Sequence, residues 1–196
     1  SYRYVSSYLD SPLRQDELSV FSKYLPALSR SSKILDVGCG NGAFLKNAVE
    51  FFGAKKGVGV EPSREGVDLL KEKYANEDAL DFESVSAHHL PFESDTFDLV
   101  TTWSVLHWIG RNEYLQALGE LLRVSNRYIV VMDFVGSCEH KVPYSHKKGF
   151  YTYKMDFEIP MLASGILNKV AEERWVMEGD QMKYISKEDL IPFEKK

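Results

Sequence analysis

The sequence predicts an α/β fold in which a doubly wound, mostly parallel sheet carries helices on both faces. Two observations support this prediction. Short apolar runs alternate along the chain with segments of helical period, which is the pattern of a parallel sheet covered on both sides. The first clear apolar run, residues 34–37, also leads directly into a glycine-rich turn at 38–42, as strands do before a ligand-binding loop and a helix.

The elements are expected in a regular order. Ser11-Pro12 predicts the start of a helix before the first strand, because proline suits the first helical position and apolar residues follow at helical spacing. Residues 136–160 show no clear period and are expected to form a loop and an edge strand near the site. The other expected elements are helices from Ala43 and behind Ser63 and Asn112, strands at 57–60, within 95–100 and at 128–132, a turn at 124–127, and an antiparallel hairpin of 170–177 with 182–186.

The glycine turn predicts a site for a nucleotide cofactor. Gly38, Gly40 and Gly42 can take positive φ and let a ligand approach the bare backbone, and the helix behind them directs its free N–H groups at the loop. The glycines alone do not identify the cofactor, because Gly38, Gly40 and Ala43 also satisfy the G-x-G-x-x-A pattern of dinucleotide-binding folds. Glu61, at the end of the second strand, is placed to accept hydrogen bonds from both hydroxyls of a ribose.

Four stretches in the correct order resemble the class I S-adenosylmethionine-dependent methyltransferases, and within them the small-molecule branch typified by quinone-biosynthesis enzymes. They are ILDVGCGNG at 34–42, VGVEPS at 58–63, LPFESDTFDLV at 90–100 and LHW at 106–108. The resemblance covers residues 33–133. It implies a Rossmann-like sheet of seven strands, mostly parallel, with a terminal antiparallel hairpin. It also implies an enzyme that moves a methyl group from S-adenosyl-L-methionine to an oxygen or nitrogen of a small metabolite and releases S-adenosyl-L-homocysteine.

The resemblance implies a set of cofactor-binding residues on the loops that follow the first four strands, together with one lid residue. In chain order they are Arg14, Asp36, Gly38, Cys39, Gly40, Glu61, Pro62, Ala87, His88, Thr102 and Trp103. The backbone at 38–40 is expected to line the methionine and ribose, with Asp36 ordering the loop. Arg14, or one of the tyrosines before it, is expected to close over the methionine carboxylate. Ser86 stands where the family commonly has an acidic residue for the adenine amino group, so that contact is weakened.

The chemistry of methyl transfer makes few demands on side chains. The leaving thioether needs no proton, so alignment and the exclusion of water are the main tasks. A hydroxyl or amine acceptor still benefits from a base, for which histidine is the usual choice near neutral pH. His107 is the candidate base, with a packed, hydrogen-bonded side chain as its alternative. Trp108 and Tyr144 are expected on the substrate side, where aromatic faces would also favour a sulfonium charge, and core packing is their alternative.

Charge and cysteine content restrict the partners. The net charge of −5 and pI near 5.6 provide no basic field, which disfavours nucleic acid or an anionic membrane as partner. No apolar run approaches the roughly 18 residues needed to span a bilayer. Two cysteines fit a reducing compartment, and we expect a cytoplasmic protein. Cys138, His140 and His146 lack zinc spacing, so we expect no metal. The partner predicted is a small-molecule acceptor, and the sequence does not predict an oligomeric state.

A single domain is expected over 1–196. Within it, residues 1–30 would form an N-terminal helix and lid, 31–135 the cofactor-binding core, and 136–196 a substrate-side loop and C-terminal hairpin. Two other functions stay open: an NAD(P)-dependent oxidoreductase, which would share the glycine loop, and a catalytically silent binding protein with the same fold, which Ser86 motivates. Residues 101–104 lack the Asn/Asp-Pro-Pro-aromatic motif of many nucleic-acid methyltransferases, so that function is disfavoured.

Overall fold

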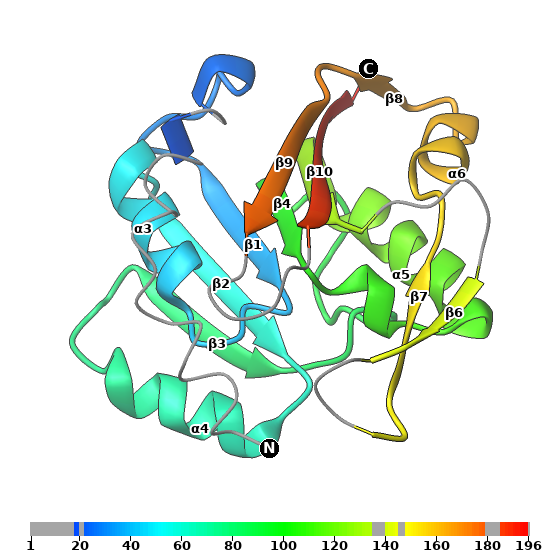
Figure 1. Ribbon diagram of the computed structural model, residues 1–196. Helices are drawn as coiled ribbons and strands as arrows, with labels where there is room; N and C mark the ends of the chain where they lie inside the picture. Colours follow the sequence, from blue (N-terminus) through cyan, green and yellow to red (C-terminus); the bar gives the residue numbers. More distant parts are fainter. Residues whose placement is uncertain (1–17, 20–21, 135–139, 145–147, 179–184, 196) are drawn as a thin grey trace.

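The computed structural model describes residues 18–19, 22–134, 140–144, 148–178 and 185–195, and its centre is a mixed sheet (Figure 1). Seven strands follow one another along the sheet in the order β3-β2-β1-β4-β5-β10-β8, and β9 also pairs with β10. The first five are parallel: β3 (Leu80–Ser84), β2 (Lys56–Glu61), β1 (Lys33–Val37), β4 (Phe97–Trp103) and β5 (Ser125–Asp133). The predicted α/β fold with a mostly parallel sheet is confirmed.

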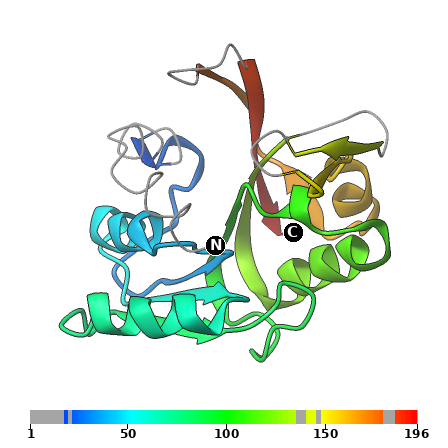
Figure 2. The same cartoon turned by 60° about the horizontal axis from the view of Figure 1, so that its bottom comes forward.

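Helices cover both faces of the sheet (Figure 2). On one face, α3 (Ala43–Phe52) and α4 (Arg64–Lys73) share a buried apolar cluster with Leu18 and Leu25 from the segment before β1. On the other face, α5 (Arg111–Val124) and α6 (Glu158–Ala163) share a second cluster. In the described part of the chain, no helix has the length and apolar character needed to cross a bilayer.

Local chemistry sets several helix ends. Ser63 caps α4 as predicted, because its hydroxyl accepts a hydrogen bond from Gly66 N–H at 3.1 Å. Gly53 ends α3 with a positive φ of 61° and donates to the last turn. The expected cap at Asn112 is wrong, since the cap is Gly110, two residues earlier, and α5 begins at Arg111. The expected turn at 124–127 is also wrong, because α5 runs to Val124 and β5 begins at the next residue.

The order of the strands places the ligand edge. The chain leaves β1 for β2 on one side and later returns to β4 on the other side. The carboxyl ends of β1 and β4 therefore flank the point where the strand order reverses, which is where open α/β sheets bind ligands. Four features of the chain lie at this edge, each at or after the end of a strand. They are the glycine turn after β1, Glu61 at the end of β2, the loop after β3 and the short 3-10 helix η1 (Leu106–Trp108) after β4.

The predicted terminal hairpin is confirmed, with a longer second strand. β9 (Glu173–Glu178) pairs with β10 (Ile185–Lys195) from Glu178 opposite Ile185 to Glu173 opposite Leu190. Residues 182–184 of the expected hairpin lie outside the described residues. β10 continues beyond the hairpin because residues 189–194 pair antiparallel with β5. The short strand β8 (Leu167–Lys169) pairs with the last residues of β10.

Within the range 136–160, the described residues 140–144 and 148–160 do not add a strand to the main sheet. β6 (His140–Pro143) and β7 (Tyr151–Lys154) pair with each other in a separate two-stranded antiparallel sheet. The expected edge strand is therefore wrong. The chain behind β7 is anchored instead by Met155, Phe157 and Met161, each at most 1% exposed in the second apolar cluster. This anchoring holds β7 against η1 at the ligand edge.

Candidate active site

The glycine loop has the backbone conformation that the sequence predicts. Gly38, Gly40 and Gly42 have φ values of 75°, 53° and 73°, which L side chains rarely adopt. The N–H groups of Gly38 and Cys39 donate to Val60 O at 2.8 and 3.0 Å and fix the loop to β2. Gly38 also faces the turn between β4 and η1, since a Cβ atom built on it would lie 2.3 Å from Cγ2 of Val105. The cofactor loop and the turn that carries His107 are thus in direct contact.

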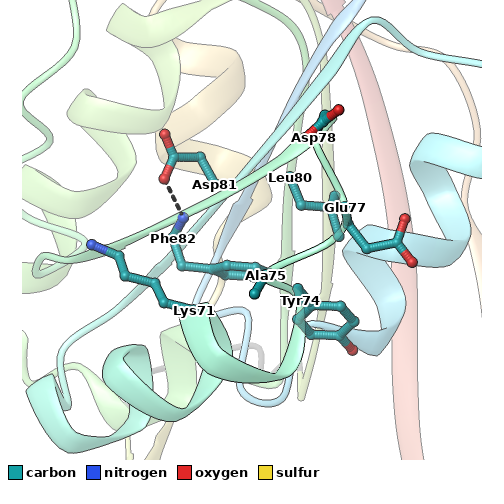
Figure 3. Close-up of a pocket in the computed structure, with 8 residues that line it drawn as sticks. All are labelled: Lys71, Tyr74, Ala75, Glu77, Asp78, Leu80, Asp81 and Phe82. Carbon is teal, nitrogen blue, oxygen red and sulfur yellow. Dashed lines mark hydrogen bonds between the residues drawn. The ribbon is translucent and has the colours of Figure 1, made fainter.

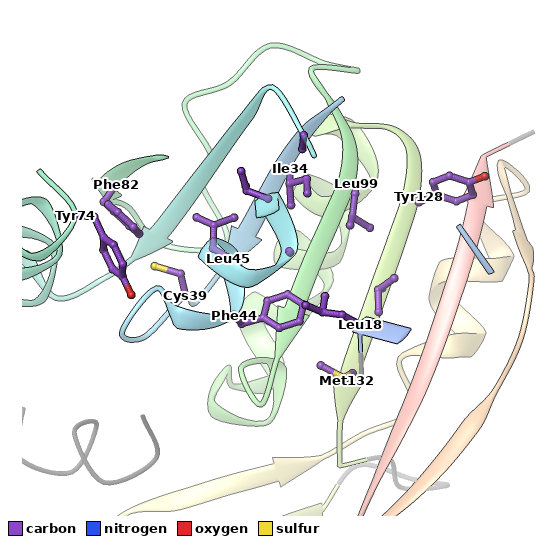
Figure 4. Close-up of a cluster of buried hydrophobic side chains, with 14 of the residues drawn as sticks. Leu18, Ile34, Cys39, Phe44, Leu45, Tyr74, Phe82, Leu99, Tyr128 and Met132 are labelled. Atoms are coloured by element: carbon purple, nitrogen blue, oxygen red, sulfur yellow. The ribbon is translucent and has the colours of Figure 1, made fainter. Parts of the chain in front are cut away.

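Cys39 belongs to the core beneath the loop (Figure 4). Its side chain is 5% exposed. Burial, and then the carboxylates of Asp36 and Glu61, raise the pKa of the thiol far above its usual range. A Cβ on Gly59 would come within 2.8 Å of the Cys39 sulfur, so the glycine in β2 makes room for it. Cys39 is therefore not a nucleophile and offers a ligand only its backbone.

Asn41 is a loop residue that the sequence analysis missed. Its side-chain Oδ1 accepts a hydrogen bond from Ala43 N–H at 3.1 Å and so supports the first turn of α3. Its carbonyl accepts from Tyr74 Oη at 3.1 Å and Lys73 Nζ at 3.3 Å. The Asn41 side chain is buried, and within the described residues its Nδ2 has no hydrogen-bond partner. A buried donor without an acceptor is unfavourable, and an acceptor atom of a bound ligand would satisfy it.

Asp36 connects β1 to β4 below the loop. It is 3% exposed, and the hydroxyl of Thr101, its neighbour on β4, donates to Oδ1 at 2.8 Å. A buried carboxylate needs such partners. This position fits the expected role of ordering the glycine loop, which remains a prediction.

Glu61 touches the glycine loop directly. Its carboxylate accepts hydrogen bonds from the backbone N–H groups of Gly40 and Ser63. Burial raises the pKa of Glu61 above its ordinary value of 4.5, and these two hydrogen bonds offset only part of the effect. Pro62 follows on the exposed side of the strand end. The carboxylate is thus oriented beside the loop, where a ribose contact is expected.

The raised pKa of Glu61 predicts a pH dependence of folding stability. The folded protein holds this proton more tightly than the unfolded chain, so the stabilisation is complete below pH 4.5 and is lost as pH rises through the raised pKa. Glu61→Gln removes the titrating group. We expect the variant to gain stability relative to the cofactor-free wild type between pH 4 and pH 7, measured as urea midpoints at both values. A difference that does not change with pH would contradict the prediction.

The loop after β3 is held in place by α5. Glu120 accepts a hydrogen bond from Leu90 N–H at 2.7 Å, and Arg123 donates to the carbonyls of Leu90 and Phe92 at 2.9 and 2.6 Å. The hydrogen bond from Arg123 lowers the pKa of Glu120 and keeps it ionised. This pairing accounts for the LPF part of the motif at 90–100.

The two predicted adenine-side residues, Ala87 and His88, precede that anchored segment. Both are half-buried. The His88 ring is turned toward Ser86, with 3.2 Å between Nδ1 and the serine hydroxyl. The hydroxyl of Ser86 and the ring of His88 are therefore each other's partner, in a contact between residues close in sequence.

Two of the predicted cofactor residues lie on β4 with their side chains in packed surroundings. Thr102 is fully buried, and no described residue pairs with its hydroxyl. Its sheet neighbours are Val37 and Val131. Trp103 packs edge-on against Phe44 of α3, with 5.5 Å between ring centroids. Arg14, the predicted lid residue, lies outside the described residues.

His107 is held by an acidic partner at the end of β5. The imidazole is 4% exposed, and its Nδ1 lies 2.6 Å from Oδ1 of Asp133. The ring packs edge-on against Phe134 at 4.9 Å and beside Trp108 at 5.2 Å between centroids. The histidine is therefore fixed in one orientation.

Asp133 was also missed by the sequence analysis. It is fully buried at the carboxyl end of β5. Oδ2 accepts from the N–H groups of Leu106 at 2.7 Å, Val105 at 3.0 Å and, more distantly, His107 at 3.4 Å. Oδ1 accepts from Phe134 N–H at 2.7 Å. An acidic residue that ends a buried apolar strand at the ligand edge is the signal that would have identified it.

The predicted substrate-side aromatics lie together beside His107. Trp108 is 43% exposed, and its ring meets Tyr144 edge-on at 4.7 Å between centroids. Tyr144 follows β6, and β7 of the same small sheet contacts η1. The structure thus brings the pair together and leaves a large face of Trp108 accessible to solvent.

A separate open hollow of about 220 Å³ lies at the edge strand β3 (Figure 3). Tyr74 and Phe82 stack on each other there at 5.4 Å. None of the predicted site residues lines the hollow. The full lining is Lys71, Tyr74, Ala75, Glu77, Asp78, Leu80, Asp81 and Phe82. The ring pair supports the glycine loop from outside, through the hydrogen bond from Tyr74 to Asn41.

Comparison with known proteins finds similarity to methyltransferases. Residues 34–127 match the family described as a methyltransferase domain. An uncharacterized methyltransferase of Schizosaccharomyces pombe is 31% identical over 134 residues, which cover 62% of this chain and 48% of that protein. A demethylmenaquinone methyltransferase of Bacillus pumilus is 27% identical over 154 residues, covering 77% of this chain and 64% of that protein.

The fold has a solved counterpart. The 1,6-didemethyltoxoflavin-N1-methyltransferase of Burkholderia thailandensis, solved with S-adenosylhomocysteine, superposes with a TM-score of 0.71 at 14% identity, covering 96% of this chain and 80% of that one. The chain spans about half the length of the S. pombe relative. The matched residues 34–127 contain the glycine loop, Glu61 and η1, so the part of the chain that forms most of the candidate site is the part that is similar to a methyltransferase domain.

Proposed function

We propose that the protein binds S-adenosylmethionine at the carboxyl edge of the sheet and transfers its methyl group to an oxygen or nitrogen of a small metabolite. The observation that carries this proposal is the His107–Asp133 pair at 2.6 Å, on a turn that contacts the glycine loop through Val105 and Gly38. A base beside a methyl donor is useful only when the acceptor has a proton to lose. Oxygen and nitrogen acceptors meet that condition.

The residues at the edge fit the cofactor. Glu61 offers an oriented carboxylate for ribose hydroxyls, Asn41 an unpaired buried donor for an acceptor atom, and the glycine loop a backbone with positive φ at Gly38 and Gly40. When bound, S-adenosylmethionine supplies an electrophilic methyl on a sulfonium centre. The protein's own tasks are to orient the acceptor against it, exclude water and take up the released proton at His107.

The narrower expectation of a quinone-biosynthesis type of acceptor is part of the proposal. The similarity to the demethylmenaquinone methyltransferase supports it, as do the paired rings of Trp108 and Tyr144 next to His107. Rings of this kind pack well against a flat, partly apolar molecule. We propose that this pair contacts the acceptor.

Calorimetry with the purified protein tests the cofactor. We expect S-adenosylhomocysteine to bind and NADH not to bind. Binding of NADH alone would overturn the proposal. A catalytically silent protein would bind S-adenosylhomocysteine yet release none from S-adenosylmethionine with a panel of phenols, quinols, sugars and amines, which would refute the transfer step.

Glu61→Ala tests the ribose contact. Loss of charge-assisted hydrogen bonds should weaken S-adenosylhomocysteine binding by about 1 to 3 kcal/mol, which is roughly 5- to 150-fold in the dissociation constant. Glu65→Ala is the matched control, because it removes the same charge from an exposed site in the first turn of α4. Equal dissociation constants for both variants and the wild type would remove Glu61 from the site.

A further inference from the structure

We propose that Asp133 is a positioning residue that holds His107 in a single tautomer, with the proton on Nδ1 and the lone pair on Nε2. This inference rests on the proposed function, because it specifies how His107 becomes competent as its base. It also goes beyond that function, since it assigns a task to a residue in β5, a strand that supplies none of the predicted cofactor or substrate contacts.

The hydrogen bonds around Asp133 decide where the imidazole proton lies. Every backbone partner of the carboxylate is an N–H donor, two on Oδ2 at 3.0 Å or less, a longer third from His107 itself, and one on Oδ1 at 2.7 Å. A carboxyl group surrounded by donors is ionised and can only accept. The group that faces it at 2.6 Å, His107 Nδ1, must therefore donate. In the neutral ring the lone pair is then on Nε2.

The same carboxylate also places the ring relative to the cofactor loop. Asp133 binds Val105 N–H at 3.0 Å, and the side chain of Val105 lies against Gly38. Ser104, the residue before it, has a positive φ of 53°, and its N–H donates to Met132 O at 2.8 Å. The turn is thus fixed from β5 at two neighbouring points. Movement of Asp133 would displace His107 and Val105 together.

With its lone pair on Nε2, His107 can take up the proton that the transfer step releases. A lone pair of the acceptor oxygen or nitrogen forms the new bond to the methyl carbon, and the carbon–sulfur bond breaks with its electron pair left on sulfur. The acceptor proton passes to His107 Nε2. The imidazolium that forms keeps its Nδ1–H on Asp133, which stabilises the new positive charge. Water takes the proton afterwards.

Asp133→Asn provides a sharp test because both oxygens of a carboxylate accept hydrogen bonds, whereas an amide has one oxygen that accepts and one NH₂ group that donates. If the amide oxygen keeps the N–H groups of Val105 and Leu106, the NH₂ group faces His107 Nδ1. That nitrogen must then accept, which moves the proton to Nε2. This orientation leaves only the N–H of Phe134 unsatisfied, whereas the opposite orientation leaves the two close donors Val105 and Leu106 unsatisfied and is disfavoured. The variant should therefore reverse the tautomer, as the wrong tautomer follows from the same change in a catalytic triad.

The experiment is ¹⁵N NMR of protein labelled at its five histidines, with the His107 signals identified by their absence in His107→Gln. We expect a protonated Nδ1 and an unprotonated Nε2 in the wild type at neutral pH, and the reverse in Asp133→Asn. A purely structural Asp133 would leave the tautomer unchanged in a folded variant, which would overturn the inference. If Asp133→Asn does not fold, the wild-type spectrum still decides, because a protonated Nε2 there refutes the proposal.

Cofactor binding separates this inference from the proposed function. Asp133→Asn should bind S-adenosylhomocysteine within about threefold of the wild type while its turnover falls as far as that of His107→Gln. The double variant should be no slower than either single variant, as expected for residues that act as a unit. A wild type with the expected tautomer but no affinity for S-adenosylhomocysteine would refute the function and leave the positioning role intact.

Discussion

Gly38→Ala should lose both folding stability and cofactor affinity. Two separate effects act on the new methyl group. At φ 75° an L residue is strained by about 1 to 2 kcal/mol. The Cβ would also lie 2.3 Å from Cγ2 of Val105, and forcing extra volume into a packed site adds about 1 to 3 kcal/mol. We expect urea unfolding to show a loss of about 2 to 5 kcal/mol. The dissociation constant for S-adenosylhomocysteine should rise at least about tenfold, as expected when a ligand loop is displaced.

Two further variants separate the strain from the clash. Gly165 has nearly the same φ, 74°, but a Cβ built there meets no atom within 4 Å. Gly165→Ala should therefore show only the strain and no change in cofactor affinity. Val105→Ala in the Gly38→Ala background removes the methyl groups that the new Cβ meets and should recover part of the loss. A Gly38→Ala protein as stable as the Gly165→Ala protein would disprove the contact between loop and turn.

His107→Ala should produce the largest effect on turnover. Removal of a positioned base typically lowers the rate by about 10²- to 10⁴-fold. Most of the predicted cofactor residues lie on the loops after β1, β2 and β3, so the dissociation constant for S-adenosylhomocysteine should change by less than about threefold, a shift of under about 1 kcal/mol. The measurement is the formation of S-adenosylhomocysteine with the best acceptor from the panel, at saturating cofactor. Full turnover in the variant would return His107 to the role of a packed side chain.

The controls for His107 address packing. His107→Gln keeps a side chain of similar length that can donate to Asp133, so it should remain folded and inactive. His89→Ala makes the same truncation at an exposed histidine on the neighbouring loop after β3, and should retain wild-type turnover. Thermal unfolding of all three variants checks that loss of activity is not loss of fold. If His107→Ala unfolds at room temperature, the turnover of His107→Gln is measured in its place.

Features set by neighbours in sequence were predictable. The positive φ values of the glycine loop follow from glycine itself, and the Ser63 cap follows from a hydroxyl just before a helical pattern. The place of Glu61 beside the glycine loop follows from its position at the end of a buried strand at the ligand edge, and its ribose contact stays a prediction. In each case the deciding contacts are local or lie one strand away, so residue type and spacing contain the information.

The contacts that join separate strands were not predictable from one sequence. Asp133 meets His107 across 26 positions, and only the register of β4 against β5, with Trp103 opposite Met132, brings them together. Val105 meets Gly38 because β1 pairs with β4, with Val37 opposite Thr102. The small sheet at 140–154 was missed because its residues have no clear period, and its position depends on the buried anchor that follows it.

The place of β10 in the sheet has a consequence for the order of folding. Residues 189–194 pair with residues 128–133 of β5 on the side away from β4, yet they are made long after the parallel strands are complete. Until then β5 exposes a row of unpaired backbone groups on an apolar strand, which is the kind of surface that recruits other chains. Pairing with β10 therefore removes an exposed strand edge that a chain without these residues would keep.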